Sequence, residues 1–303
     1  MATPQIGIFT QGSTQYYYLE YQIDWSKPLA DIRAALKAAV QQNLPTNLVV
    51  AFGQQAWSQL VAEQPDSISM PEGLCDFAPI ESRDGYVLPS TQSDLFFWIH
   101  SGRTDDNFDR VQSIATAMEG FAELVLDLPG FCYHDSRDLS GFVDGSANPK
   151  TDSTRLEAAL IPEGKPGAGG AFVLGQKWIH NLKAFHQMPV KEQEGVIGRT
   201  KPDSIELEGD DMPENSHVSR TDAKVDGVAM KMWRRSAPFA SASEKGLFFL
   251  AFACELRRYE VLLERMYGLA EDGVRDRLIE FSTPVRSSYW FAPSLEDLET
   301  VLN

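Results

Sequence analysis

An α+β fold is predicted for this chain, because short apolar runs of strand length alternate with segments whose apolar residues recur every three or four positions. The run Leu95–His100 has the character of a buried strand. The segment after it carries apolar residues at helical spacing, at Phe108, Val111, Ala115 and Met118. Tight turns between several predicted strands indicate antiparallel pairing. The expected product is antiparallel sheet covered by helices.

The second half of the chain repeats this order of elements. Gly246–Phe252 is predicted to be a strand of the same kind. The helix predicted after it carries its apolar residues on one face, at Tyr259, Leu262, Leu263 and Met266. A duplicated domain would end each half with such a strand and helix.

The earlier elements of the first half follow from the same signals. They are strands at Ile6–Phe9 and Tyr16–Ile23, an amphipathic helix at Leu29–Val40, a strand at Leu48–Phe52 and a short helix around Trp57. The join between the halves is placed at residues 149–170, where glycine and proline give a linker composition. Domains are therefore expected at residues 1–148 and 171–303.

Composition limits the classes of function. The net charge of −16, from 27 basic and 43 acidic residues, argues against nucleic-acid binding, which needs a basic surface. It also argues against contact with an anionic membrane. Such a surface favours neutral or cationic substrates over anionic ones.

The sequence also shows no sign of export. Met1–Ile6 contains no basic or twin-arginine leader, and no apolar run approaches the length of a membrane span. The three cysteines form no C-x-x-C pair. A cytoplasmic protein without disulfides is expected.

Several common catalytic motifs are missing. The five histidines lack His-x-x-x-His or His-Glu-x-x-His spacing, so a zinc hydrolase has no support. There is no Gly-x-Ser-x-Gly nucleophile and no Gly-x-Gly-x-x-Gly dinucleotide turn. The cluster Gly167–Gly170 is not followed by the Lys-Ser/Thr of a P-loop.

The most informative stretch is a glycine turn, Gly141-Phe142-Val143-Asp144-Gly145. Glycine permits a positive φ and a close approach of the backbone to a ligand. A turn of this kind can therefore hold and aim the Asp144 carboxylate. The same pattern also suits a plain loop in which Asp144 caps the next element.

Two later segments, Ser216-His217 and Arg234-Arg235-Ser236, add to this turn. Together they resemble the dye-decolorising peroxidases, a haem family whose signature is Gly-x-x-Asp-Gly, and most closely its short bacterial branch, class B. The resemblance covers nearly the whole chain. It implies two ferredoxin-like domains, each a four-stranded antiparallel sheet with helices, and haem b bound between the sheet and helices of the C-terminal half.

The resemblance also implies roles for individual residues on one side of the haem. His217 corresponds to the iron ligand. Glu280 is predicted to accept the hydrogen bond of the other ring nitrogen, because a carboxylate within an otherwise apolar strand pattern needs a reason to be there. Arg199 matches a position that meets a haem propionate. An ordinary surface ion pair would look the same in sequence.

On the opposite side of the haem the resemblance implies Asp144 and Arg234, with Gly145 closing the turn. Met230–Arg234 alternates like a strand, so only one of the two neighbouring arginines can face the haem. The family pattern selects Arg234 and places Ser236 on the same face. Many members carry asparagine where this chain has serine.

The implied activity is that of a haem b peroxidase, which reduces hydrogen peroxide to water and oxidises dyes, phenolics or similar reductants by one electron at a time, through a ferryl intermediate. Asp144 would move the peroxide proton, and Arg234 would stabilise the developing negative charge. The ordinary aspartate pKa, about 3.9, predicts activity strongest at acidic pH unless burial raises it. Tyr133, Trp233 and Tyr289 are candidate electron relays.

Two other functions remain open. One is a haem-handling protein, a carrier or iron-releasing factor, with incidental peroxidase activity; a proton-moving acid opposite an arginine argues against it. The other is a haem-free ferredoxin-like binding module. Because family members form dimers and larger rings, a homo-oligomer is expected. No encapsulin-targeting tail is evident after the family core ends near Phe291–Ser294.

Overall fold

The computed structural model describes residues 2–41, 43–63 and 68–303. Its principal sheet has nine antiparallel strands, in the order β10-β12-β7-β13-β2-β5-β1-β6, with β11 also paired to β12. Two small hairpins, β3–β4 and β8–β9, lie outside it. No helix in the described ranges is long and apolar enough to cross a membrane.

Each half of the chain contributes one side of this sheet. The first half supplies β1 (Gln15–Ile23), β2 (Asn47–Phe52), β5 (Leu95–Ser101) and β6 (Ala122–Phe131). The second supplies β7 (Ala171–His180), β10 (Trp233–Arg234), β11 (Ala237–Ala240), β12 (Lys245–Ala253) and β13 (Ser282–Ala292). In both halves the strands lie in the order second, third, first, fourth, with β10 and β11 sharing the second place. This repeat confirms two ferredoxin-like units, which join where Phe291 of β13 pairs with Phe52 of β2.

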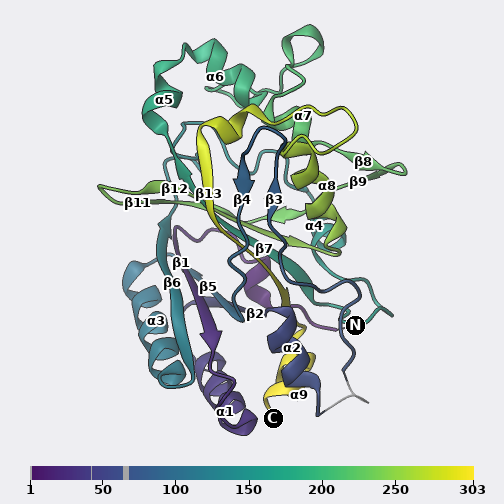
Figure 1. The fold of residues 1–303 in the computed structure, drawn as a ribbon. Coiled ribbons are helices and arrows are strands. Elements are labelled where there is room, and N and C mark those ends of the chain that lie inside the picture. Colours follow the sequence, from purple (N-terminus) through teal and green to yellow (C-terminus); the bar gives the residue numbers. More distant parts are fainter. Residues whose placement is uncertain (1, 42, 64–67) are drawn as a thin grey trace.

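The helices are distributed between the two units (Figure 1). The first unit has α1 (Leu29–Val40), α2 (Gln54–Val61) and α3 (Thr104–Met118), and the last helix, α9 (Leu295–Leu302), packs against α1. The second unit has α4 (Asp152–Ala159), α5 (Leu182–Gln187), α6 (Val190–Ile197), α7 (His217–Thr221) and α8 (Arg257–Met266). Short 3-10 helices lie at η1 (Ile6–Ile8), η2 (Gly209–Asp211) and η3 (Arg277–Glu280).

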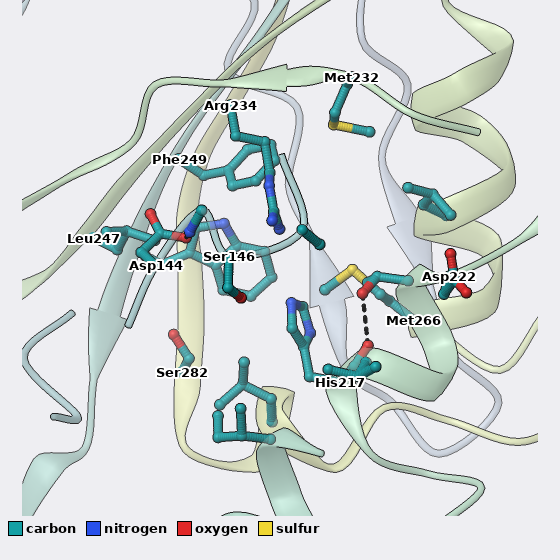
Figure 2. Close-up of a pocket in the computed structure, with 18 of the residues that line it drawn as sticks. Asp144, Ser146, His217, Asp222, Met232, Arg234, Leu247, Phe249, Met266 and Ser282 are labelled. Atoms are coloured by element: carbon teal, nitrogen blue, oxygen red, sulfur yellow. Dashed lines mark hydrogen bonds between the residues drawn. The ribbon is translucent and has the colours of Figure 1, made fainter. Parts of the chain in front are cut away.

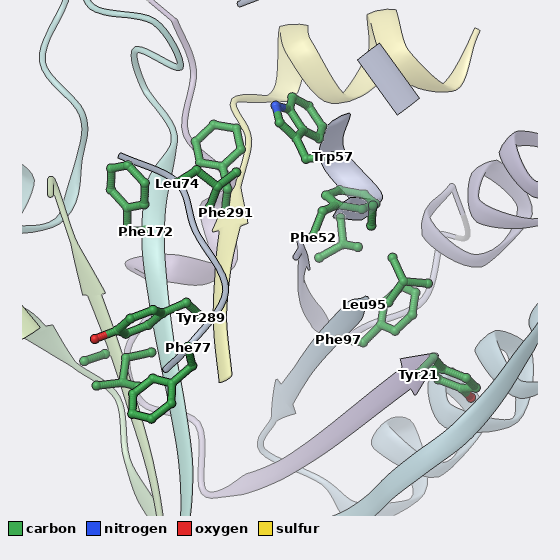
Figure 3. Close-up of a cluster of buried hydrophobic side chains, with 14 of the residues drawn as sticks. Tyr21, Phe52, Trp57, Leu74, Phe77, Leu95, Phe97, Phe172, Tyr289 and Phe291 are labelled. Atoms are coloured by element: carbon green, nitrogen blue, oxygen red, sulfur yellow. The ribbon is translucent and has the colours of Figure 1, made fainter. Parts of the chain in front are cut away.

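The larger core lies between the sheet and helices, and it runs from one unit into the other. Phe52 lies 5.5 Å from Trp57, and Trp57 lies 5.2 Å from Phe291, measured between ring centroids. Phe172 continues this row into the second unit, 6.3 Å from Phe291 (Figure 3). A shared core of this kind makes the two units one packed body rather than two linked domains.

The opposite face of the sheet closes on itself. Tyr18 of β1 stacks on Phe248 of β12 at 4.1 Å, and Phe96 of β5 stacks on Trp290 of β13 at 4.6 Å. Strand β11 also packs against β6. Because aromatic rings fill this inner face, a ligand site has to lie on the helix-covered side.

Most of the predicted strands and helices are confirmed, and the differences have local causes. Ile6–Phe9 was predicted as a strand and is the 3-10 helix η1, in which Ile8 N–H donates to Gln5 O at 3.1 Å. Phe108 is 57% exposed, because α3 turns Val111 and Ile114 toward the core instead. The predicted strand at Met230–Arg234 is strand only at its end.

The predicted linker at residues 149–170 is ordered and packed. It contains α4, and Cys254 N–H donates to Ala158 O at 3.0 Å, which fixes this helix to the end of β12. The predicted boundaries at residues 148 and 171 stay a prediction. All three cysteines are free thiols.

Candidate active site

A cavity of about 270 Å³ lies between strands β7 and β12 and helices α7 and α8 of the second unit. Most of its wall is apolar and comes from Leu174, Trp178, Leu247, Phe249, Leu262, Leu263 and Met266. Polar groups face each other across it: Arg234 points down from β10, His217 points up from α7, and Asp144 lies beside Arg234 (Figure 2). The cavity is where the sequence predicted a ligand, between the sheet and helices of the C-terminal half.

Asp144 is held by the backbone of the glycine turn. Gly141 and Gly145 have φ of +91° and +74°, a region that residues with a side chain rarely adopt. Asp144 N–H donates to Ser136 O at 3.0 Å, and Gly145 N–H donates to Asp144 Oδ1 at 2.7 Å. Both glycines thus have the positive φ that the sequence analysis expected in this turn.

Asn148 links this turn to the strand that carries the arginine. Its Nδ2 donates to Arg234 O at 2.9 Å, and its Oδ1 accepts from Arg234 N–H at 3.0 Å. The two hydrogen bonds fix the turn and β10 relative to each other. Sequence reasoning missed Asn148, although it lies only four positions after Asp144.

The two neighbouring arginines point in opposite directions, as strand alternation predicted. Arg234 lines the cavity. Arg235 lies on the other side of β10, where its guanidinium is 4.8 Å from the Trp98 ring and donates to Ile8 O at 2.9 Å and Thr10 O at 2.6 Å. Burial lowers the pKa of Arg235 to about 10. Arg235 is therefore a structural residue that anchors the N-terminal segment.

Asp144 lines the cavity and is partly buried. Burial raises the pKa of Asp144, and the nearby charge of Arg234 lowers it without cancelling that effect. The sequence predicted activity strongest at acidic pH unless burial raised the pKa of Asp144, and burial does raise it. Asp144 is expected to exchange protons at a higher pH than an exposed aspartate does.

His217 begins the short helix α7, and side chains from elsewhere fix its ring. Ser216 caps the helix by accepting a hydrogen bond from Ser219 N–H at 3.2 Å. His217 Nδ1 donates to Asp276 Oδ2 at 2.7 Å, and the Asp276 side chain is fully buried. Asp276 Oδ1 accepts from Leu278 N–H at 2.8 Å. This leaves His217 Nε2 without a hydrogen-bond partner among the described residues, at the cavity wall.

The prediction that Glu280 accepts this hydrogen bond is wrong. Glu280 lies in η3 rather than in a strand, and its Oε1 accepts from Arg275 Nη2 at 2.9 Å. The residue that sequence reasoning missed is Asp276. It lies between Arg275 and Arg277 in the sequence, a pattern that is typical of a solvent-exposed charged residue.

The other predicted cofactor residues divide between lining and non-lining positions. Gly145 and Arg199 line the cavity. Arg199 also forms an ion pair with Glu206 at the same wall. Ser236 is not brought to the cavity, because its Oγ accepts a hydrogen bond from Leu250 N–H at 3.3 Å. Of the candidate relays, Trp233 and Tyr289 are each only 4% exposed.

A second histidine, His180, lines the cavity and was not singled out from the sequence. Its Nε2 is 3.0 Å from Asp138 Oδ1, and its Nδ1 is 2.7 Å from Ser282 Oγ. Hydrogen bonds from His180 and Ser140 lower the pKa of Asp138 despite the opposing effect of its burial. The contacts tie the loop before the glycine turn to β7 and β13.

Family models match nearly all of the chain. The model for the N-terminal region of Dyp-type peroxidases matches residues 3–132, and the model for the C-terminal region matches residues 135–297. This chain belongs to the Dyp-type peroxidase family. It is therefore a peroxidase, and the two models meet before the glycine turn rather than after it.

Similar proteins support the same assignment. A dye-decolorizing peroxidase of Rhodococcus erythropolis is 31% identical over 277 residues, which cover 89% of this chain and 79% of that protein. One from Mycobacterium tuberculosis is 32% identical over 256 residues, covering 84% and 75%. Among solved structures, DyPB from Rhodococcus jostii RHA1 matches with a TM-score of 0.89 and 34% identity, covering 98% of both chains. A dye-decolorizing protein from V. cholerae matches at 0.87 with 34% identity, covering 98% of this chain and 99% of that one. Variants of the R. jostii protein have been solved in complex with heme.

Proposed function

We propose that this Dyp-type peroxidase holds haem b in the cavity and reduces hydrogen peroxide to water while oxidising small reductants such as dyes or phenolics. The observation that supports it best is the facing arrangement of one histidine nitrogen and one acid–arginine pair across an apolar cavity. Complexes of the R. jostii relative with heme support the choice of cofactor.

The residues of the cavity fit this cofactor. The apolar wall suits a large flat macrocycle, and an iron at its centre can take one imidazole nitrogen from the protein. His217 Nε2 is the nitrogen that remains for this purpose, since Nδ1 is bonded to Asp276. The guanidinium of Arg199, which lines the same cavity, suits a propionate. When bound, haem supplies a redox-active iron that takes two oxidising equivalents from peroxide and passes them on one at a time.

Asp144 is proposed to move the peroxide proton. Among the described residues its Oδ1 accepts from Gly145 N–H, so Oδ2 is the oxygen that can take a proton from one peroxide oxygen and return it to the other. The proton count is unchanged by this transfer, because one oxygen leaves with both protons as water when the O–O bond breaks. The other oxygen becomes a second water only with the two electrons that the reductant supplies one at a time and two further protons. The raised pKa of Asp144, caused mainly by burial, makes the carboxylate a stronger base and so favours uptake of the peroxide proton.

Arg234 is proposed to stabilise the negative charge that develops on the departing oxygen. A guanidinium stays protonated throughout the working pH range, and a fixed charge in an enclosed cavity needs no reorganisation during the reaction. The hydrogen bonds of Asn148 to the Arg234 backbone keep this charge next to the Asp144 turn.

His217 is proposed to hold the iron in an electron-rich setting. Its Nδ1–H bond to the buried Asp276 carboxylate fixes the tautomer and ring orientation, and it makes Nε2 a stronger electron donor to a metal. This combination favours the oxidised iron that a peroxidase needs.

A haem titration of the apoprotein tests the proposal. We expect the wild type to bind haem with one imidazole ligand in the visible spectrum, and His217→Ala to lose tight binding. His186→Ala is the matched control, because His186 does not line the cavity and its Nε2 lies 3.2 Å from Ser140 O. Equal haem retention and equal spectra in the two variants would contradict the assignment of His217.

A haem carrier or iron-releasing protein is the alternative, and the same preparation separates the two. A carrier needs His217 but gains nothing from a buried acid beside a guanidinium. In a peroxidase, rapid mixing of the haem-loaded protein with peroxide should change the visible spectrum at once. A reductant added afterwards should be consumed in proportion to the peroxide. The expectations of a homo-oligomer and of a cytoplasmic location stay predictions.

A further inference from the structure

The β3–β4 hairpin (Ile80–Glu81 and Val87–Leu88) belongs to the first unit, yet its turn reaches the loop between α8 and β13 of the second (Figure 1). Asp84 in this turn accepts a hydrogen bond from Arg275 Nε at 2.8 Å. The Arg275 guanidinium also lies over the Tyr86 ring, 4.3 Å from its centroid. The hairpin therefore contacts Arg275, the residue that directly precedes Asp276, through both a hydrogen bond and an aromatic ring.

The hairpin turn is built to present Asp84. Ser82 Oγ donates to Asp84 Oδ1 at 2.7 Å and accepts from Tyr86 N–H at 2.8 Å. Ser82 N–H donates to Tyr86 O at 2.9 Å, and Gly85 closes the turn with φ of +88°. Asp84 is thus aimed by its own turn before it meets Arg275.

Each of the three guanidinium nitrogens of Arg275 donates a hydrogen bond to an acceptor other than the Asp276 carboxylate. Nε donates to Asp84, Nη2 donates to Glu280 Oε1 at 2.9 Å, and Nη1 donates to the backbone oxygen of Asp276 at 3.2 Å. The Asp276 carboxylate is left to accept from His217 and from the Leu278 backbone. Glu280, which is not the partner of His217, thus has a different place in the site: it holds Arg275.

A guanidinium prefers a carboxylate to a neutral acceptor. An Arg275 released by Asp84 would lie next in sequence to the buried Asp276 carboxylate and could pair with it. Such a pair would withdraw charge from the hydrogen bond to His217, and the imidazole would then donate less to iron.

We propose that the β3–β4 hairpin is a positioning element for the His217–Asp276 pair, which it protects by holding Arg275 away from the Asp276 carboxylate. The first unit would then act on the histidine wall of the cavity, although the histidine and its acid both belong to the second. The effect at the haem rests on the proposed function of His217; the effect on the His217–Asp276 hydrogen bond does not.

Three variants separate this role from a general effect of charge. Asp84→Asn removes the hairpin carboxylate. Glu192→Gln is the matched control: it makes the same charge change, and its partner Arg277 lies on the other side of Asp276 in sequence, at 2.6 Å. Asp84→Asn combined with Arg275→Gln restores the wild-type net charge and removes the competing guanidinium.

The test needs two preparations, one with haem and one without. In the haem-loaded protein, the midpoint potential of the iron should shift to more positive values in Asp84→Asn than in Glu192→Gln, and haem should dissociate about 10-fold faster. The double variant should return both values to near the wild type. In the haem-free protein labelled with ¹⁵N-histidine, the hydrogen-bonded Nδ1–H signal of His217 should weaken in Asp84→Asn and recover in the double variant.

The proposal is overturned if Asp84→Asn and Glu192→Gln shift the potential equally, or if the Nδ1–H signal of His217 is unchanged in Asp84→Asn. It is also overturned if the double variant keeps the full defect. A wild type that binds no haem through His217 would defeat the proposed function instead. The signal of the haem-free protein would still decide the role of the hairpin.

Discussion

The Asp144 wall and the His217 wall of the cavity are built in different ways. Asp144 is aimed by main-chain groups that are near it in the sequence: its own N–H donates to Ser136 O, and Gly145 N–H donates to its carboxylate. His217 is aimed by a side chain 59 positions later, Asp276. A group held by its own backbone leaves a pattern in the sequence, whereas a group held by a distant side chain leaves none.

The two walls also differ in whether the same contacts that fix the position of the side chain set its electrostatic properties. The glycines of the Asp144 turn fix a position, and burial then sets the proton affinity of the acid. On the His217 wall the partner carboxylate sets both the position and the electronic character of the ring. Substitutions should therefore change the chemistry of the first wall without loosening it, and change both properties of the second.

The largest effect should come from Asp144→Asn. The amide keeps the size of the side chain but cannot accept the peroxide proton, so the peroxide step should slow by about 10²–10⁴-fold. Haem content should not change, because the wall is held by its backbone. Stopped-flow mixing with peroxide and a haem assay measure the two properties. A wild-type rate in the variant would return Asp144 to a structural role.

The pH dependence of this variant sharpens the test. The wild-type rate should fall as pH drops through the raised pKa of Asp144, since the base becomes protonated, and the variant should lack this ionisation. The free energy of unfolding should respond to pH in the opposite direction from the rate. A carboxyl with a raised folded pKa costs stability above that pKa, and the cost vanishes below the unfolded value of 3.8. Haem-free Asp144→Asn should thus melt higher than the wild type at pH 7, and no higher at pH 3.

The neighbouring arginines at the end of β10, Arg234 within the strand and Arg235 just after it, should separate into one functional and one structural residue. Arg234→Leu should slow the peroxide step by about 10²–10³-fold, the loss expected for one group that stabilises a developing charge. Arg235→Leu should leave that step nearly unchanged but lower the free energy of unfolding by about 1–3 kcal/mol, because Arg235 donates to two backbone oxygens. Denaturant unfolding and stopped-flow rates would expose a reversed ranking.

The smallest of these effects should appear on the His217 wall. Asp276→Asn should weaken haem retention or activity by about 10–100-fold, as removal of a ligand's hydrogen-bond partner commonly does. Glu280→Gln is the comparison, since its carboxylate meets Arg275 rather than His217, and its effect should be smaller. Haem dissociation measured by transfer to an excess of a haem-binding protein gives both values. A larger loss in Glu280→Gln would restore the sequence-based assignment.

The sequence was sufficient where local chemistry decides the outcome. The Asp144 turn follows from its glycines, and the choice of Arg234 over Arg235 follows from strand alternation together with the family resemblance. The duplicated sheets follow from the repeated order of strand and helix. In each of these cases neighbouring residues impose the geometry on one another.

Only the tertiary structure decided the partners that come from distant segments. Asp276 rather than Glu280 meets His217, because η3 turns Glu280 toward Arg275 where the sequence pattern indicated a continuous strand. Asn148 meets the Arg234 backbone only because the turn and β10 pack together. The burial that raises the pKa of Asp144 is likewise a property of the closed cavity wall. Residue spacing along the chain predicts backbone conformation, but it does not predict which distant side chain pairs with a buried charged group. That pairing is set only when the two segments pack together in the folded protein.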